Sequence, residues 1–342
     1  MLVLVLVLVL LLVVTVALTL ALLSQKGRPV QSAATAPGPP VVDLSARISR
    51  YVAPFRAGQG YRAPTAAERS AVADAVAELV AGRGSAGRAR LGSVGYRVNE
   101  LRDRATGRLV DEVADADPAR ESGRGWGRIY LDLSAAARWT VQVPHPVADQ
   151  NTEKVGAAVF EAEPGGVLVV AGAHRRAAPD GAADVAHNAD TVFAAVLDRL
   201  ASAGLPGIQV HGFDEGSLPG VDSVFSPGAA APGPAVLRTA EALTAAGFSL
   251  CRPWLEGCGQ LAGTTNVEGR YAASIGVPFL HVELSPSVRA EAGPRQRLAV
   301  VLGRTAARWN TGEWGARRSV AGLTDPLSDP PSDPAGSAGA LA

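Results

Sequence analysis

The segment WTVQVPHPVADQNTEKVGAAVFEAEPGGVLVVA, from Trp139 to Ala171, decides the fold. It begins and ends with short apolar runs of strand type, Trp139–Val143 and Val167–Ala171. Between them, the stretch from about Asn151 to Phe160 has the apolar spacing of a helix. A strand, a helix and a second strand in this order predict two parallel strands joined by a helical crossover.

The same alternation continues on both sides of this segment. Because strands that alternate with helices form sheets covered on both faces, we expect an α/β domain with a mixed, mostly parallel sheet. Further strands are predicted at Arg128–Leu133, Ile208–Val210 and Val277–Val282, and further helices at about Asn188–Ala203, Ala235–Ala246 and Ser287–Trp309.

The part of the chain before this pattern is predicted to support the core. Thr65 and Glu68 form a capping-box pattern ahead of an apolar-periodic stretch, which predicts a helix. The runs Val94–Leu101 and Arg108–Val113 flank a Thr-Gly pair and are expected to pair as a hairpin. This part contains no His or Cys, so we assign it no chemistry.

The N-terminal run Leu2–Leu23 is apolar except for two threonines. About 20 apolar residues can span a bilayer, whereas a cleavable signal has roughly 7–15, so we prefer a membrane anchor with the domain outside. A cleaved signal and a secreted domain are the alternative, with small residues near Ala33–Ala36 available for cleavage. Lys26 and Arg28 oppose this orientation, because the positive-inside rule places that end in the cytoplasm.

The composition of the chain indicates how it is divided and argues against nucleic acid and nucleotides as partners. A chain of 342 residues with 47% hydrophobic content can bury a full core, and 32 basic against 32 acidic residues leave nothing to attract nucleic acid. No Gly-x-Gly-x-x-Gly motif opens a helix after a predicted strand, and no Gly-x-x-x-x-Gly-Lys-Ser/Thr motif is present, so we expect no nucleotide cofactor. The predicted divisions are an anchor or signal over 1–23, an Ala/Pro-rich linker over 24–42, a supporting helix and hairpin over 43–126, a metal-site core over 127–318 and a disordered tail over 319–342.

The histidines gather in the core. Four of the five lie at or near the C-terminal end of a predicted strand, where successive loops of an α/β sheet converge and ligands bind. Taken singly, each is as readily explained as a structural residue. The five are His145, His174, His187, His211 and His281.

The sequence favours a zinc site at these strand ends. His145 ends one strand, Glu153 opens the next helix, and His211 ends a later strand, which supplies the imidazole and carboxylate groups that catalytic zinc uses. Asp149 is a rival for the carboxylate ligand. We prefer Glu153 as ligand, with Asp149 as a hydrogen-bond partner that orients His145.

A second group of residues could do the acid–base work. Alternation places His281 and Glu283 on one side of an apolar strand, and Glu283 is our candidate general base; a carboxylate favoured by the dipole of the following helix is the alternative. Arg175, at another strand end, could bind a substrate carboxylate or an oxyanion. For His174, Arg176 and His187 we prefer a structural or supporting role, and Arg270 and Arg289 are further candidates for a substrate carboxylate.

The order of these residues resembles that of zinc-dependent N-acetylmuramoyl-L-alanine amidases and related carboxypeptidase-like hydrolases, including poly-γ-glutamate hydrolases. The resemblance covers about residues 139–300. It implies a three-layer α/β/α fold of the phosphorylase/hydrolase-like kind, one zinc ion held by His145, Glu153 and His211, and catalysis by Glu283. The spacing between His145 and Glu153 is wider than in carboxypeptidases, and Pro146 replaces the glycine common in the amidases.

The leading hypothesis is therefore an exported zinc amidohydrolase or peptidase that acts on a peptide-like or cell-wall substrate with carboxylates. A membrane-tethered, non-catalytic binding domain of the cell envelope is the alternative. A metal-free serine hydrolase is disfavoured because the sequence has no Gly-x-Ser-x-Gly motif. Cys251 and Cys258 could close a disulfide, as expected outside the cytoplasm, or could be two buried thiols.

Overall fold

The structure is a computed structural model that describes residues 12–17, 19 and 38–310. Most of the predicted anchor, the linker up to residue 37 and the whole predicted tail lie outside the described residues. Within the described ranges, no helix is both long and apolar enough to cross a bilayer.

The described domain is built on one mixed sheet of 10 strands, in the order β1-β2-β3-β4-β6-β5-β7-β10-β8-β9. Its centre is parallel and consists of β6 (Gly166–Val170), β5 (Trp139–Val143), β7 (Gly207–Gly212) and β10 (Phe279–Leu284). The predicted mixed, mostly parallel sheet is confirmed.

The chain changes direction across the sheet at β5. After β5, helix α6 (Thr152–Ala162) leads to β6 on one side, and α7 (Val192–Ser202) then leads to β7 on the other side. The carboxyl end of β5 is therefore the point where loops leave toward both neighbours, which is where open α/β sheets bind ligands.

The supporting part extends this sheet. Strands β2 (Tyr96–Asp103) and β3 (Leu109–Asp115) form the predicted antiparallel hairpin, and α3 (Ala66–Val80) begins with the predicted capping box at Thr65. The remaining elements are β1 (Val41–Val42), α2 (Leu44–Val52), α4 (Gly84–Ser93), α5 (Pro118–Arg124), β4 (Arg128–Asp132), η1 (Pro179–Gly181), η2 (Glu215–Ser217), β8 (Ser223–Ser226), α8 (Pro234–Ala245), β9 (Leu250–Cys251), η3 (Gly259–Ala262), α9 (Val267–Ser274), α10 (Pro286–Ala290) and α11 (Ala292–Asn310).

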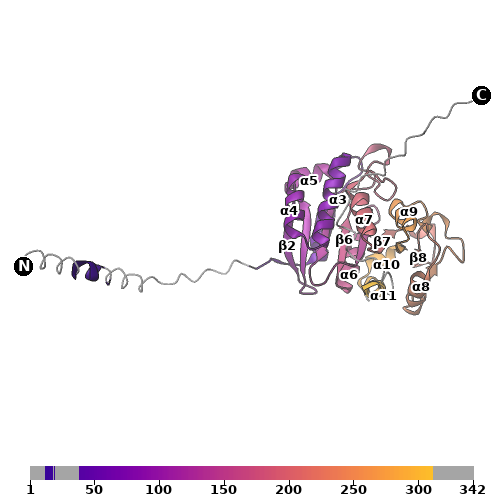
Figure 1. The fold of residues 1–342 in the computed structure, drawn as a ribbon. Coiled ribbons are helices and arrows are strands. Elements are labelled where there is room, and N and C mark those ends of the chain that lie inside the picture. Colours follow the sequence, from indigo (N-terminus) through magenta and orange to yellow (C-terminus); the bar gives the residue numbers. More distant parts are fainter. Residues whose placement is uncertain (1–11, 18, 20–37, 311–342) are drawn as a thin grey trace, which may run out of the picture. The chain divides into compact units, whose positions relative to one another are not determined.

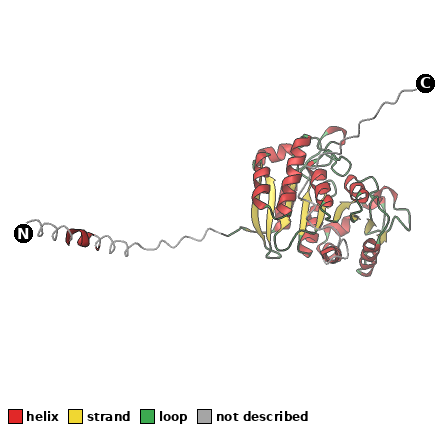
Figure 2. Cartoon of the chain, viewed as in Figure 1, coloured by secondary structure: helices red, strands yellow, loops and turns green. Residues whose placement is uncertain are grey.

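Helices cover both faces of the sheet. Alternation within β6 sends Leu168 and Val170 to the core shared with α2, α6, α8 and α11, and Val167 and Val169 to the core shared with α3 and α7. Figure 1 shows α3 beside α7 and α6 beside α11, and Figure 2 shows the strands between the helices. The three-layer arrangement follows from these two cores.

Some predicted boundaries were wrong for local reasons. Strand β10 starts two residues later than predicted, directly after Pro278, which has no backbone N–H to donate. Helix α7 starts at Val192 because the Thr191 side chain caps it by accepting from the Ala194 backbone. The long helix predicted from Ser287 is two helices, because Glu291 adopts an extended conformation between them.

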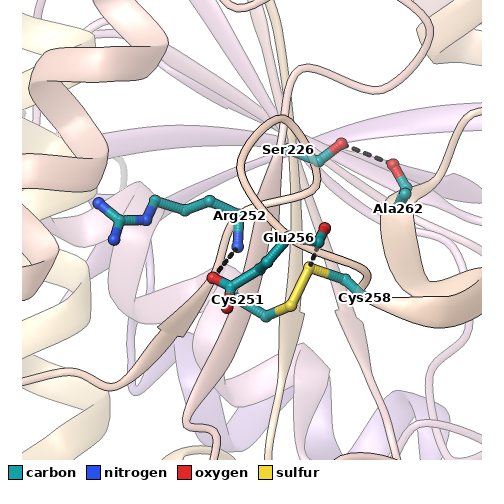
Figure 3. The surroundings of a disulfide bond; sticks show 6 residues. All are labelled: Ser226, Cys251, Arg252, Glu256, Cys258 and Ala262. Atoms are coloured by element: carbon teal, nitrogen blue, oxygen red, sulfur yellow. Dashed lines mark hydrogen bonds between the residues drawn. A yellow bond between two sulfur atoms is a disulfide. The ribbon is translucent and has the colours of Figure 1, made fainter.

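The cysteines are bonded. The disulfide between Cys251 and Cys258 closes a loop after β9, and Figure 3 shows the nearby contact in which Ser226 donates to the Ala262 carbonyl. The loop then reaches the sheet centre, because an added Cβ on Gly263 would lie 2.4 Å from the His281 ring. The disulfide thus restrains the segment that packs against His281.

We expect the Cys251→Ser, Cys258→Ser double variant to lose about 2 to 3 kcal/mol of unfolding free energy, because a short cross-linked loop no longer restrains the unfolded chain. Urea unfolding measures this loss. The wild type in reducing agent serves as the control and should match the variant. Equal unfolding free energies for oxidised and reduced wild type would contradict the expectation.

Candidate metal centre

The loop after β5 carries two of the candidate residues, and its backbone is strained beside them. His145 follows the strand, and the Asp149 N–H donates to the His145 carbonyl, which turns the chain back. Val147 and Asn151 have φ of 71° and 66°, a region that a β-branched residue such as valine rarely enters. Backbone strain of this kind gathers at functional sites, where the surrounding structure enforces it.

This turn directs the Asp149 carboxylate between two histidines. Its Oδ2 atom lies 3.3 Å from His145 Nδ1 and 3.5 Å from His211 Nδ1. The Gly212 backbone donates to the same oxygen at 3.2 Å. Gly212 is needed here, because an added Cβ would lie 2.5 Å from the Arg289 guanidinium. His145 and Asp149 lie in the loop after β5, His211 lies on the neighbouring strand β7, and all three side chains are buried.

In His145 and His211, the contact made by Nε2 shows which ring nitrogen carries the proton. His145 Nε2 is 2.8 Å from Asp184 Oδ1, and His211 Nε2 is 2.6 Å from Gln209 Oε1. Two acceptors approach this closely only with a hydrogen between them, so in the neutral rings both protons are on Nε2. The two Nδ1 atoms therefore present lone pairs to the Asp149 carboxylate.

Three electron-pair donors that face one another fit a cation. Zinc bonds of about 2.0–2.1 Å in tetrahedral geometry place neighbouring ligand atoms about 3.3 Å apart, close to the two separations at Asp149. Two further groups of potential ligands occur in the described residues, and each borrows one histidine of this set. They are His145 with Asp184 and His187, and His211 with His281 and Glu283.

The charges suit this assignment. Burial opposes ionisation of Asp149, but its interactions with His145 and His211 hold its pKa well below the usual range. Burial lowers the pKa of His211 to about 4, so this ring is neutral at pH 7, as a metal ligand must be. Burial alone would lower the pKa of His145, but its bonds to Asp149 and Asp184 raise it.

Glu283 lies beside this group with a free acceptor. It pairs in register with His211 on the neighbouring strand, and its side chain is buried. Its Oε2 atom and His281 Nδ1 have no hydrogen-bond partner among the described residues. Burial, followed by the charge of Asp149, raises the pKa of Glu283 to about 8. A buried carboxyl group that titrates near neutrality suits general acid–base catalysis.

Arg175 reaches the same edge of the sheet. Its Nε and Nη2 atoms donate to Asp184, and its Nη1 atom lies 3.4 Å from His145 Nδ1. His187 is half exposed and contacts Asp184 at 3.2 Å, whereas His174 accepts from the Arg176 backbone through Nδ1. Asp184 therefore links Arg175, His145 and His187.

Three of the candidate residues lie apart from the group of His145, Asp149 and His211. Glu153 belongs to none of the ligand groups in the described residues, because α6 starts at Thr152 and the Glu153 carboxylate accepts from Ser49 on α2. Arg289 donates to the carbonyls of Leu284, Ser285, Gln150 and Phe213, so its guanidinium fastens backbone segments. Arg270 is exposed on α9.

Sequence reasoning missed Asp184 and the partners of Gln209. Asp184 lies three residues before His187, a spacing that could have signalled a shared site. Gln209 alternates with His211 on β7, and its amide contacts Gln142, Glu268 and Asn266. No local pattern connects these three, because they come from separate parts of the chain.

No protein-family profile matches the chain, and no curated protein matches its sequence. Among solved structures, it is similar to N-formylglutamate amidohydrolase from Ralstonia eutropha, at 14% identity and a TM-score of 0.41 over 55% of this chain and 99% of that one. An aspartoacylase family protein from Mesorhizobium loti has 13% identity and a TM-score of 0.36 over 61% and 67%. The LapA aminopeptidase of Legionella pneumophila has 8% identity and a TM-score of 0.34 over 77% and 69%. Likenesses this distant assign no activity.

The raised pKa of Glu283 has a measurable consequence for stability. Its ionisation costs free energy in the folded state, so the penalty is absent below pH 4.5, grows toward pH 8 and is constant above. In metal-free protein, the unfolding free energy of Glu283→Gln should exceed that of the wild type by on the order of 3 kcal/mol at pH 9. The two unfolding free energies should be equal near pH 4. Urea unfolding at both pH values measures the difference, with the exposed Glu215→Gln as control. A difference that does not change with pH would contradict this.

Proposed function

We propose that this protein is a zinc-dependent hydrolase that cleaves an amide bond in a peptide-like substrate. The observation that carries the proposal is the approach of His145 Nδ1, Asp149 Oδ2 and His211 Nδ1 to one another with no proton assigned between them. A buried carboxylate between two lone pairs is unfavourable unless a positive charge joins them. These three residues would hold one zinc ion per chain.

When bound, zinc polarises a carbonyl group, strengthens water as a nucleophile and, by its charge, favours the ionised form of Glu283. Glu283 then takes a proton from the attacking water and returns it to the leaving amine nitrogen. Its Oε2 atom, which lacks a partner in the described residues, is the acceptor in the first transfer.

The substrate is proposed to carry a carboxylate. Arg175 Nη1 faces the site while Asp184 holds the rest of the guanidinium, so this donor is fixed in position for an anionic oxygen. A cavity of about 590 Å³ is lined in part by Ala173 and His174, the two residues that precede Arg175 in the chain. Its walls include Arg50 and Arg56, together with an ion pair between Arg128 and Glu121 that cancels, which favours an acidic substrate over a basic one.

We further propose that the protein works outside the cytoplasm, either anchored or secreted, on a cell-wall or other peptide-like polymer. The disulfide supports an oxidising compartment.

Zinc binding by variants of Asp149 and Glu153 shows which of these two carboxylates is a ligand. We expect about one zinc per chain in the wild type and its loss in the His145→Ala, His211→Ala double variant. Asp149→Asn should weaken zinc binding at least about 100-fold, because a ligand is lost, whereas Glu153→Gln should change the Kd less than about 3-fold. Chelator competition measures both. The reverse order of the two variants would return Glu153 to the ligand set.

Turnover tests the role of Glu283. The zinc-loaded protein is expected to release amine from a panel of N-acyl amino acids, peptides and muramoyl peptides, with acidic members preferred. Glu283→Gln should retain zinc and lower kcat by about 10²- to 10⁴-fold. Glu215→Gln is the matched control. Zinc binding without turnover of any panel member would favour a binding domain, and an active Glu283→Gln variant would exclude Glu283 as the base.

A further inference from the structure

A buried polar network lies behind His211. Gln209 is fully buried on β7, two residues before His211, and its amide makes contacts at both ends. Its Nε2 atom donates to Gln142 Oε1 at 2.9 Å and to Glu268 Oε2 at 3.1 Å. Its Oε1 atom accepts from Asn266 Nδ2 and from His211 Nε2. All four positions of the amide are thus used.

The direction of this network is set by one backbone group. Asn266 caps α9, and its Oδ1 atom accepts from the Gly269 backbone N–H at 2.8 Å. A backbone N–H can only donate, so the Asn266 amide cannot be reversed, and its Nδ2 atom must face Gln209. Gln209 must then present Oε1 on that side, and the nitrogen of His211 that contacts Oε1 must carry the proton.

We propose that the cap of α9 selects the tautomer of His211 through Gln209, and so leaves His211 Nδ1 free to bind the cation. Asn266 and Gln209 are positioning residues, because neither is a ligand itself. The inference rests on the proposed function, since it concerns a ligand of the proposed zinc site.

Reversal of the network should reverse the tautomer. Asn266→Asp keeps the cap, because aspartate also accepts from the Gly269 N–H, but it replaces the donor that faces Gln209 with an acceptor. The Gln209 amide then gains by turning round, so that Nε2 faces the introduced carboxylate and His211. Burial raises the pKa of Glu268 to about 8, so the neutral carboxyl group can donate to the turned Oε1. His211 Nε2 becomes an acceptor, and the proton moves to Nδ1.

Asn266→Ser is the matched control. Serine also caps helices, but its hydroxyl is too short to reach Gln209 and places no acceptor against Oε1. Gln209 then has no reason to turn, and His211 keeps its tautomer. Both variants keep a residue that caps α9. They differ in that only Asn266→Asp places a hydrogen-bond acceptor against Gln209.

The test is the long-range ¹H–¹⁵N spectrum of histidine rings in metal-free protein at pH 7, with His211 assigned from a His211→Gln variant. We expect the Nε2–H tautomer in wild type and Asn266→Ser, and the Nδ1–H tautomer in Asn266→Asp. The zinc Kd from chelator competition should rise at least about 10-fold in Asn266→Asp and stay within about 3-fold in Asn266→Ser.

An Asn266→Asp variant that keeps the Nε2–H tautomer, or a wild type that already has Nδ1–H, would overturn the inference. Equal zinc Kd values for the two variants would also overturn it. If the wild type binds no zinc, the proposed function fails, but the tautomers in metal-free protein still decide whether Asn266 controls His211.

Discussion

The site depends on the approach of the Asp149 carboxylate to the Nδ1 atoms of His145 and His211. The two histidines are far apart in sequence, and they meet because β5 and β7 are parallel neighbours that end at the same edge. Asp149 joins them because a short turn with strained backbone brings it back over the strand end. A buried anion between two lone pairs is costly unless a cation or a proton occupies the centre. In the protein without a metal, Asp149 and Asp184 raise the pKa of His145, which favours a proton on this ring as the source of positive charge.

Each ligand is oriented by a partner outside the centre. Asp184 fixes His145 and holds Arg175, and Gln209 fixes His211. The partners of Gln209 connect the site with α9, and α9 follows the loop that the disulfide closes. Residues of β7 and α9, which are distant in sequence, therefore determine which nitrogen of His211 carries the proton. Glu153, although not in the group, joins α6 to α2, and α2 contributes to the cavity beside Arg175.

The sequence was informative where structure is local. The periodicity of Trp139–Val143 and of the runs around it predicted the parallel centre, and the strand-end positions of His145, His211 and Glu283 predicted that they converge. The sequence led us to prefer Glu153 over Asp149 as the ligand, and it could not decide between them reliably, because the choice depends on whether the helix begins before or after Asn151. The turn that follows His145 sets this boundary, and no pattern of residues in the sequence predicts that turn.

The most direct measurement is a crystal structure of the zinc-loaded protein with anomalous scattering recorded on both sides of the zinc edge. The account predicts one strong peak bonded to His145 Nδ1, Asp149 Oδ2 and His211 Nδ1. A peak held instead by His211, His281 and Glu283, or by His145, Asp184 and His187, would contradict the assignment of ligands. In the first case it would also remove Glu283 as the base.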